Sequence, residues 1–319
     1  MSPDVQLLTI GRISVDLYAE QLGVPLAEVR TFAKSIGGSP TNVAVAAARL
    51  GTRSAVVTAV GDDEFGRFVC GKLEGFGVDT RFVGAHPTLR TPLAIAAMDP
   101  PDDPTLVFYR EPSAPDEHVE TSPALLAAAA AAEIFWVAGS CLSGLETGPT
   151  TRALLEARER ARHTVIDLDY RPTFWPDERT ASREIGAALD HATIAVGNRR
   201  ECEVAVGTGE PDAAADALLA RGIELAVVKL GSEGVLVATP NERTRVAPVP
   251  IDVVCGLGAG DAFGGALCHS LLTGAPPAKA VHYANGAGAI VASRLLCADA
   301  MPTAAEVDAL LEEQETHVR

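Results

Sequence analysis

The residues that point most directly to a chemistry lie in the run Gly256–Gly265, which reads GLGAGDAFGG. Glycine lets the backbone approach an anion closely, and the free N–H groups and macrodipole of a helix's first turn favour a bound phosphate. Asp261 is the one carboxylate in this run, and a carboxylate repels phosphate. It is therefore a candidate general base that takes a proton from an incoming hydroxyl group. The competing interpretation is an aspartate that caps the helix.

A second glycine pair, Gly37–Gly38, comes just before Asn42 near the start of a predicted helix. The backbone of the pair and the amide of Asn42 suit a polyhydroxylated ligand, and Asp16 could accept hydrogen bonds from two of its hydroxyl groups. A structural alternative is that Ser39 or Thr41 simply caps the helix. We favour the ligand-binding interpretation.

Charged residues follow the predicted strand Thr164–Leu168, in the segment Asp167–Trp175. Open α/β sheets bind ligands beyond the carboxyl ends of their strands. Arg171 in this segment and Arg110 in the run FYRE are candidates for a substrate carboxylate, because guanidinium groups bind carboxylates in a bidentate manner. An ion pair among Asp167, Asp169 and Arg171 that fixes the loop is the alternative, and it is compatible with binding.

Two further motifs suit a nucleotide. Asn198 and Glu201 lie three residues apart at the start of a predicted helix, so both can face one site and hold magnesium-bound water beside phosphates. A capping box has the same spacing. Lys229 opens the run KLGSEG, whose glycines Gly231 and Gly234 form a turn that suits a nucleotide and equally a plain hairpin.

The elements that must position these residues alternate between short buried strands and alanine-rich helices, which is the pattern of a parallel sheet covered by helices. We predict strands at Leu7–Ile10, Ser54–Val60, Glu133–Val137, Thr164–Leu168, Thr193–Val196 and Leu225–Lys229. We predict helices at Thr41–Leu50, Glu64–Phe76, Arg152–Arg162 and Asp212–Arg221. Towards the C-terminus the pattern predicts an antiparallel pair at Gly234–Thr239 and Thr244–Pro248, followed by the helices Ala259–Leu272 and Pro276–Leu295.

Two segments, at about 11–36 and 88–112, do not fit this alternation and predict strands of a small inserted sheet. Such a sheet could close over a substrate and exclude water, which protects a phosphate donor from hydrolysis. It could also pair with a second copy of the chain in a homodimer. A turn is expected at 99–104. Because the sequence has no repeat or low-complexity linker, residues 1–319 are interpreted as a single domain.

Composition limits the function classes. The chain has 319 residues, 47% of them hydrophobic, and a formal net charge of −16. This charge argues against nucleic acid or an anionic membrane surface as a partner, since both require clustered Lys and Arg. The six cysteines form no C-x-x-C pair, and the N-terminal sequence has no signal-peptide pattern. We therefore expect a reduced, cytoplasmic protein.

The order of these motifs resembles that of the ribokinase-like, or PfkB-type, carbohydrate kinases across nearly the whole chain. The resemblance implies a three-layer α/β/α core with a mainly parallel sheet and an inserted β-sheet lid, with ATP and Mg²⁺ as cofactors. It implies that Asp261 is the catalytic base and that Gly258, Ala259 and Gly260 form an anion hole. It assigns Gly37, Gly38 and Asn42 to the sugar, Asn198 and Glu201 to magnesium and phosphate, and Lys229, Gly231, Gly234 and Asn285 to the nucleotide.

Within this family, several stretches are similar to the branch that phosphorylates 5-dehydro-2-deoxygluconate in inositol catabolism. They are Gly11–Tyr18, Ser35–Asn42, Phe108–Arg110, Asp167–Arg171 and Cys297–Pro302. The similarity implies a keto-deoxy sugar acid that is phosphorylated on its terminal hydroxyl, with Asp16, Arg110, Asp169 and Arg171 around it. The 2-keto-3-deoxygluconate kinases typically carry Asn at the position of Asp169.

The family often has Asp-Thr-Thr before the last glycine motif, where this chain has Cys255–Leu257. A monovalent-cation requirement is therefore not carried over. The alternatives within the family are a 2-keto-3-deoxygluconate kinase and a fructokinase. Outside it, they are a non-catalytic sugar-acid sensor and a dinucleotide-dependent oxidoreductase, although the first strand is not followed by G-x-G-x-x-G.

Overall fold

The computed structural model describes residues 4–100, 104–161 and 163–317, so part of the turn expected at 99–104 lies outside it. A nine-stranded sheet forms the centre, in the order β13-β12-β11-β10-β9-β8-β1-β4-β5, and its neighbouring strands are parallel except in the pairs β11–β12 and β12–β13. Its strands are β1 (Leu7–Ile10), β4 (Ser54–Gly61), β5 (Val83–His86), β8 (Ile134–Ala138), β9 (Thr164–Asp167), β10 (Ile194–Asn198), β11 (Leu225–Lys229), β12 (Val235–Ala238) and β13 (Arg243–Val246).

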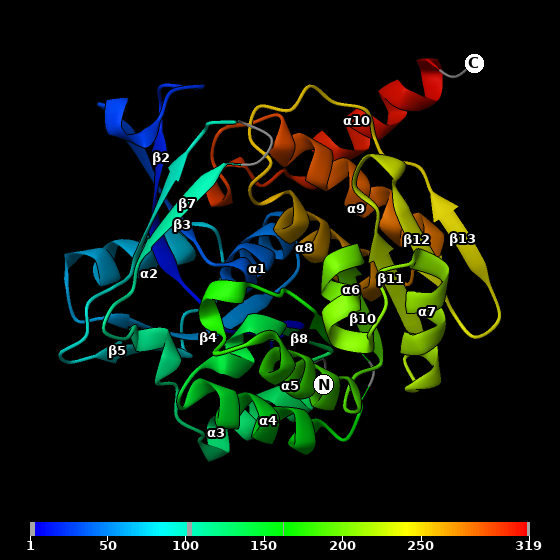
Figure 1. The fold of residues 1–319 in the computed structure, drawn as a ribbon, viewed down its shortest axis with the longest axis horizontal. Helices are drawn as coiled ribbons and strands as arrows, with labels where there is room; N and C mark the ends of the chain where they lie inside the picture. The colour runs from blue at the N-terminus through cyan, green and yellow to red at the C-terminus, as the bar shows by residue number, and fades with distance from the viewer. Residues whose placement is uncertain (1–3, 101–103, 162, 318–319) are drawn as a thin grey trace.

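Helices cover both faces of this sheet (Figure 1). One face packs against α1 (Ser39–Arg49), α2 (Glu64–Gly75), α8 (Ala259–Leu272), α9 (Pro277–Ala292) and α10 (Ala304–His317). The other packs against α3 (Pro123–Ala131), α4 (Thr147–Arg158), α5 (Glu178–Leu189), α6 (Arg199–Val206) and α7 (Pro211–Ala220). Successive strand residues serve opposite cores, as Val56 and Val57 do, which is why the central strands are hydrophobic without alternation.

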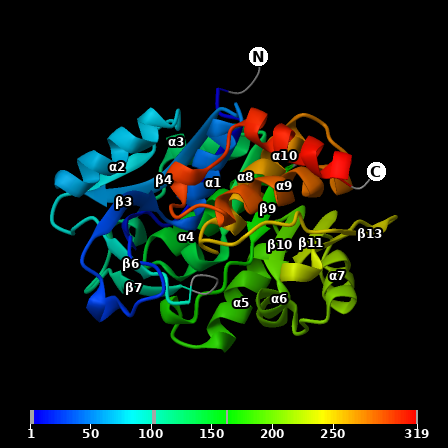
Figure 2. The ribbon, with the colours of Figure 1, turned by 90° about the horizontal axis from the view of Figure 1, so that it is seen from above.

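A second sheet of four strands, here called the lid sheet, has the order β3-β2-β6-β7. Its strands are β2 (Ser14–Ala19), β3 (Phe32–Gly37), β6 (Leu93–Ala97) and β7 (Thr105–Tyr109). Figures 1 and 2 show it at the end of the molecule opposite β13. The predicted inserted sheet is thereby confirmed, as is the three-layer core with a mainly parallel main sheet.

One predicted helix, Arg152–Arg162, was misplaced. The helix found there, α4, begins at Thr147 and ends at Arg158. Glu159 and Arg160 have φ angles of 49° and 57°, a left-handed backbone that cannot continue an α-helix. The predicted antiparallel pair is present as β12 and β13.

All six cysteines are free thiols. Across the ranges that the structure describes, no helix is both long enough and apolar enough to cross a bilayer.

Candidate active site

A cavity of about 330 Å³ lies beneath the lid sheet. Its walls come from lid strands β2, β6 and β7, from the carboxyl ends of β9 and β11, and from the first turn of α8. It brings together most of the predicted site residues: Asp16, Gly38, Asn42, Arg110, Asp169, Arg171, Glu201, Lys229, Gly258, Gly260 and Asp261. Segments far apart in the sequence thus meet in one place.

Asp261 lies in the first turn of α8, inside this cavity. Gly258 is the N-cap of the helix, with a φ of 79°, and no side chain caps the helix. The interpretation of Asp261 as the cap is therefore wrong. Its Oδ2 atom accepts a hydrogen bond of 2.8 Å from Nδ2 of Asn42. Burial raises the pKa of Asp261, although hydrogen bonds from Asn42 and Ser39 act in the opposite direction.

Two glycines allow this contact, because they bring α8 close to α1 and to the sheet. A Cβ atom on Gly265 would lie 2.4 Å from the Cβ of Ala46 in α1, and one on Gly264 would lie 2.7 Å from the Trp136 ring in β8. Larger residues would push α8 away. The glycines therefore fix the position of Asp261 relative to Asn42.

Asp16, on lid strand β2, lies on the opposite wall. Its carboxylate accepts hydrogen bonds from the hydroxyl groups of Ser14, at 2.6 Å, and Tyr18, at 3.1 Å. Burial raises the pKa of Asp16 to about 6, against the lowering effect of these two donors. A Cβ atom on Gly37 would lie 2.0 Å from the carboxylate, so Gly37 makes room for Asp16 without lining the cavity itself.

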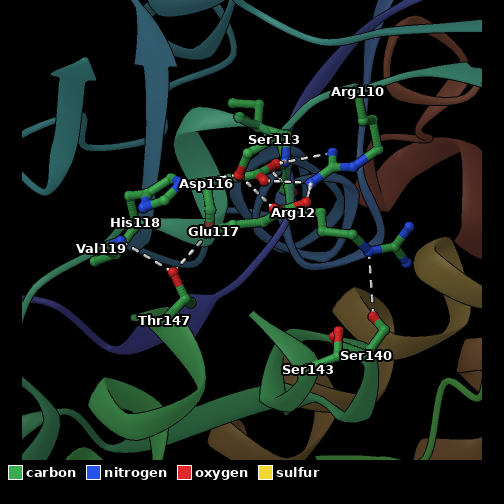
Figure 3. A network of polar contacts seen from close by, with 12 residues as sticks. Arg12, Arg110, Ser113, Asp116, Glu117, His118, Val119, Ser140, Ser143 and Thr147 are labelled. Atoms are coloured by element: carbon green, nitrogen blue, oxygen red, sulfur yellow. Dashed lines mark hydrogen bonds and ion pairs between the residues drawn. The ribbon is translucent and has the colours of Figure 1, made fainter. Parts of the chain in front are cut away.

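Arg110 lies at the lid end of the cavity, where both of its Nη atoms donate to carboxylates while its buried Nε atom has no hydrogen-bond partner. Its Nη2 atom donates to Oδ1 of Asp116 at 2.5 Å and to Oε1 of Glu117 at 3.1 Å, and its Nη1 donates to Oδ2 of Asp116 at 3.2 Å. Figure 3 shows Arg110 turned towards these carboxylates. Burial acts to lower the pKa of Arg110, but the carboxylates outweigh it and the pKa is raised.

Arg12 joins Asp169 in a second cluster. Its Nη2 donates to Asp169 at 3.0 Å and its Nε to Ser140 at 3.2 Å, while its guanidinium lies 4.4 Å from the centre of the Phe174 ring. Arg171 donates from Nε to Asp169 at 3.2 Å, which confirms the Asp169–Arg171 part of the predicted ion pair, whereas Asp167 lies beside Lys229 instead. Burial acts to raise the pKa of Asp169, but the two guanidinium groups outweigh it and the pKa is lowered.

The far end of the cavity fits a magnesium ion with phosphate. The Oδ1 atom of Asp167 is buried without a hydrogen-bond partner and lies 3.9 Å from Nζ of Lys229. Glu201 lines the same space. The described residues contain no group of three or more His, Cys, Asp or Glu that could hold a metal by themselves. An ion here would therefore take further ligands from water and phosphate.

Several predicted nucleotide residues do not line the cavity. Asn198 and Glu201 form a capping box, with bonds of 2.9 and 2.7 Å, so the structural interpretation of their spacing is confirmed while Glu201 still faces the cavity. Gly234 has a structural reason, because a Cβ there would lie 2.2 Å from the carbonyl oxygen of Val246 across the hairpin. Three more predicted site residues lie outside the cavity lining: Ala259 of the predicted anion hole, and Gly231 and Asn285 of the predicted nucleotide site. Gly231 has a φ of 62°, and the side chain of Asn285 donates to the carbonyl of Ala247.

Several residues that line the cavity were not predicted as site residues from the sequence, among them Arg12, Ser14, Tyr18 and Cys297. Asp167 was predicted only as an ion-pair partner. A signal for Arg12 was present. It follows directly after β1, at the carboxyl end of a central parallel strand, where ligand-binding residues concentrate.

Known proteins resemble the chain over nearly its whole length. A model of the pfkB family of carbohydrate kinases matches residues 5–304. The 5-dehydro-2-deoxygluconokinase of Halalkalibacterium halodurans is 30% identical over 322 residues, covering 98% of this chain and 96% of that protein. A putative ribokinase II from E. coli in complex with ATP and Mg²⁺ superposes with a TM-score of 0.88 at 22% identity, covering 97% and 99% of the two chains. A Vibrio cholerae fructokinase with fructose, ADP and calcium ion bound superposes with a TM-score of 0.82 at 27% identity, with the same coverage.

Proposed function

This chain belongs to the pfkB family of carbohydrate kinases, and we propose that it phosphorylates the terminal hydroxyl of a keto-deoxy sugar acid with ATP. The specific reaction proposed is 5-dehydro-2-deoxy-D-gluconate to its 6-phosphate, in inositol degradation. One observation carries the proposal: a candidate base, Asp261, and a cluster of arginines lie in the same cavity. The name of the Halalkalibacterium relative supports the choice of acid.

Asp261 acts as the general base in this reaction. It accepts the proton of the acceptor hydroxyl as the hydroxyl oxygen forms a bond to the γ-phosphorus, while the bond from that phosphorus to the β–γ bridging oxygen breaks. The hydrogen bond from Asn42 to Oδ2 holds the carboxylate of Asp261 in the cavity. Backbone N–H groups of Gly258–Gly260 stabilise the developing negative charge at the start of α8.

Lys229 and Glu201 serve the phosphate end of the donor, with Asp167 as a further member. Mg²⁺, when bound near Asp167 and Glu201, neutralises phosphate charge. Burial acts to lower the pKa of Lys229, but the surrounding carboxylates, Asp167 and Glu201 foremost, together outweigh it and the pKa is raised. The lysine therefore stays protonated and can bind phosphate oxygens. Asn198, Gly231, Gly234 and Asn285 remain candidates for the rest of the nucleotide.

Asp16, Gly38 and Asn42 bind sugar hydroxyl groups, and the arginines around Asp169 bind the carboxylate. Lid strands β2, β6 and β7 cover the reacting groups and exclude water. A neutral sugar would leave an arginine of this cavity without an anion, which disfavours fructose. 2-Keto-3-deoxygluconate satisfies the same contacts and is the second candidate. The argument against it is Asp169, because the 2-keto-3-deoxygluconate kinases typically carry Asn at that position.

The test is coupled ADP production over a panel of 5-dehydro-2-deoxygluconate, 2-keto-3-deoxygluconate and fructose. We expect kcat/KM for the first acid to exceed that for fructose by about 100-fold or more, because an unpaired buried charge costs about 3 kcal/mol. Equal rates on fructose would remove the sugar-acid assignment. Binding of the acids without ADP release would identify a sensor instead of a kinase.

A further inference from the structure

The three arginines that line the cavity differ in how completely the protein neutralises them. Arg110 pairs with two carboxylates, Asp116 and Glu117, so this group carries a net charge of −1. Arg12 and Arg171 share one carboxylate, Asp169, so their group carries +1. A bound monoanion would balance the second group and would add to the excess of negative charge in the first.

The hydrogen-bonding capacity follows the same division. Both Nη atoms of Arg110 already donate to carboxylates. Arg12 uses Nε and Nη2, and Arg171 uses only Nε. Among the described residues, Nη1 of Arg12 and both Nη atoms of Arg171 have no protein acceptor. Arg110 retains only its buried Nε atom without a partner, a single N–H that cannot bind both oxygens of a carboxylate. Arg12 and Arg171 therefore supply most of the donors that remain for a ligand.

Arg12 is also held more firmly than Arg171. Its side chain is 14% exposed, whereas that of Arg171 is 53% exposed. The peptide bond that follows Arg12 is fixed at both of its polar atoms, because Thr41 donates to the carbonyl of Arg12 at 3.0 Å and the N–H of Ile13 donates to Asp116 at 2.8 Å. A preorganised, partly buried guanidinium loses little entropy when it binds an anion.

We propose that Arg12, together with Arg171, binds the carboxylate of the acceptor and determines its specificity, and that Arg110 instead ties lid strand β7 to the core through Asp116. This assignment rests on the proposed function, since it presumes an acidic acceptor. Figure 3 shows the division, with the Arg110 guanidinium at Asp116 and that of Arg12 extending to the opposite side, towards Ser140.

The test measures binding of D-gluconate and its neutral counterpart D-sorbitol by calorimetry, and ADP production on the sugar-acid panel. Variants are Arg12→Gln, Arg12→Lys, Arg110→Gln and, as a matched control, Arg243→Gln. Arg243 also pairs with two carboxylates, Asp212 and Asp216, but lies on the remote β13 hairpin.

We expect Arg12→Gln to weaken gluconate binding and raise KM for the acid by at least about tenfold, with sorbitol binding and kcat nearly unchanged. Arg12→Lys should bind gluconate more tightly than Arg12→Gln does, though less tightly than wild type. Arg110→Gln should change the binding of gluconate and sorbitol by similar factors. The assignment is overturned if Arg12→Gln weakens both ligands equally, or if Arg110→Gln alone removes the preference for gluconate. A wild-type protein with no preference for gluconate over sorbitol would instead contradict the acidic acceptor itself.

Discussion

Asp261 is held by the amide of Asn42, which also lines the cavity, so the proposed base and the proposed acceptor site share one residue. Replacing Asp261 with Asn keeps the shape of the side chain and removes its ability to take a proton. We expect kcat to fall by about 10³-fold while the dissociation constant for the sugar acid changes little, because general bases contribute about 10²–10⁴ to rate. ADP release and calorimetry measure the two quantities. Asp216→Asn, on the surface of α7, is the control, and turnover within tenfold of wild type in Asp261→Asn would show that the base lies elsewhere.

Asp16 connects ligand binding to stability. Its pKa is about 6 in the folded protein against an ordinary 3.8, so the folded state holds the proton more tightly than the unfolded state. The stabilising contribution is therefore complete below pH 3.8 and is lost as the pH rises through 6.

Asp16→Asn stays neutral and avoids this loss. Between pH 4 and pH 7 we expect the free energy of unfolding of the variant to rise relative to wild type by about 1–2 kcal/mol. Urea denaturation at both pH values measures the difference. A difference that is constant with pH would show that Asp16 is ionised in the folded protein over the whole range.

At the scale of residues, the sequence could identify the groups that lie within single motifs, such as Asp261 beside its glycines and Asn42 after Gly37–Gly38. It could not identify the role of Arg12. The partner Asp169 lies 157 positions away, and only the folded sheet brings the ends of β1 and β9 together. The environment of Arg110 was hidden for a similar reason, because its neutralisation by Asp116 depends on how the lid meets the core.

At the scale of elements, the close packing of α8 on α1 positions the base. Gly265→Ala would place a methyl group 2.4 Å from Ala46 Cβ, so we expect a loss of about 1–3 kcal/mol of stability and a lower kcat as α8 shifts. Thermal unfolding and ADP release measure the two effects.

The matched control is Gly71→Ala in α2, where the added Cβ would meet no atom within 4 Å. This change should stabilise the protein by about 0.5–1 kcal/mol, because alanine favours a helix over glycine, and should leave kcat unchanged. If Gly265→Ala and Gly71→Ala changed stability and kcat equally, the packing of α8 on α1 would not depend on the close contact at Gly265.

Most elements could be predicted because their signals are local. Strands buried on both faces are continuous hydrophobic runs, and the bounds of β1, β11 and α8 are those predicted. The start of α4 was missed because its first turn reads TGPT, which contains poor helix formers and sits there for reasons of packing, with Thr147 and Thr151 buried.

At the scale of the whole molecule, the lid sheet has two faces. Leu106 and Phe108 of β7 line the cavity, so their strand neighbour Val107 points to the outer face. Tyr109 lies on the same outer face and is 59% exposed. We expect this face to pair with that of a second copy.

Light scattering after size-exclusion chromatography would then give the mass of a dimer for wild type and of a monomer for Tyr109→Glu, which introduces a charge on the outer face. Leu145→Glu changes another exposed apolar residue, 69% exposed, that is not part of the lid sheet, and it should leave the dimer intact. A wild-type monomer would contradict the expectation.

The hydrogen bond between Asn42 and Asp261 joins positions 219 apart in the chain. During synthesis, the ribosome therefore releases the groups that face the sugar long before the carboxylate that completes the site. In the proposed mechanism, a chain that terminates before α8 has the lid strands and Arg12 but no base to take the acceptor's proton. Incomplete translation products would then consume no ATP through this reaction, and phosphoryl transfer would begin only when α8 and the residues after it have docked.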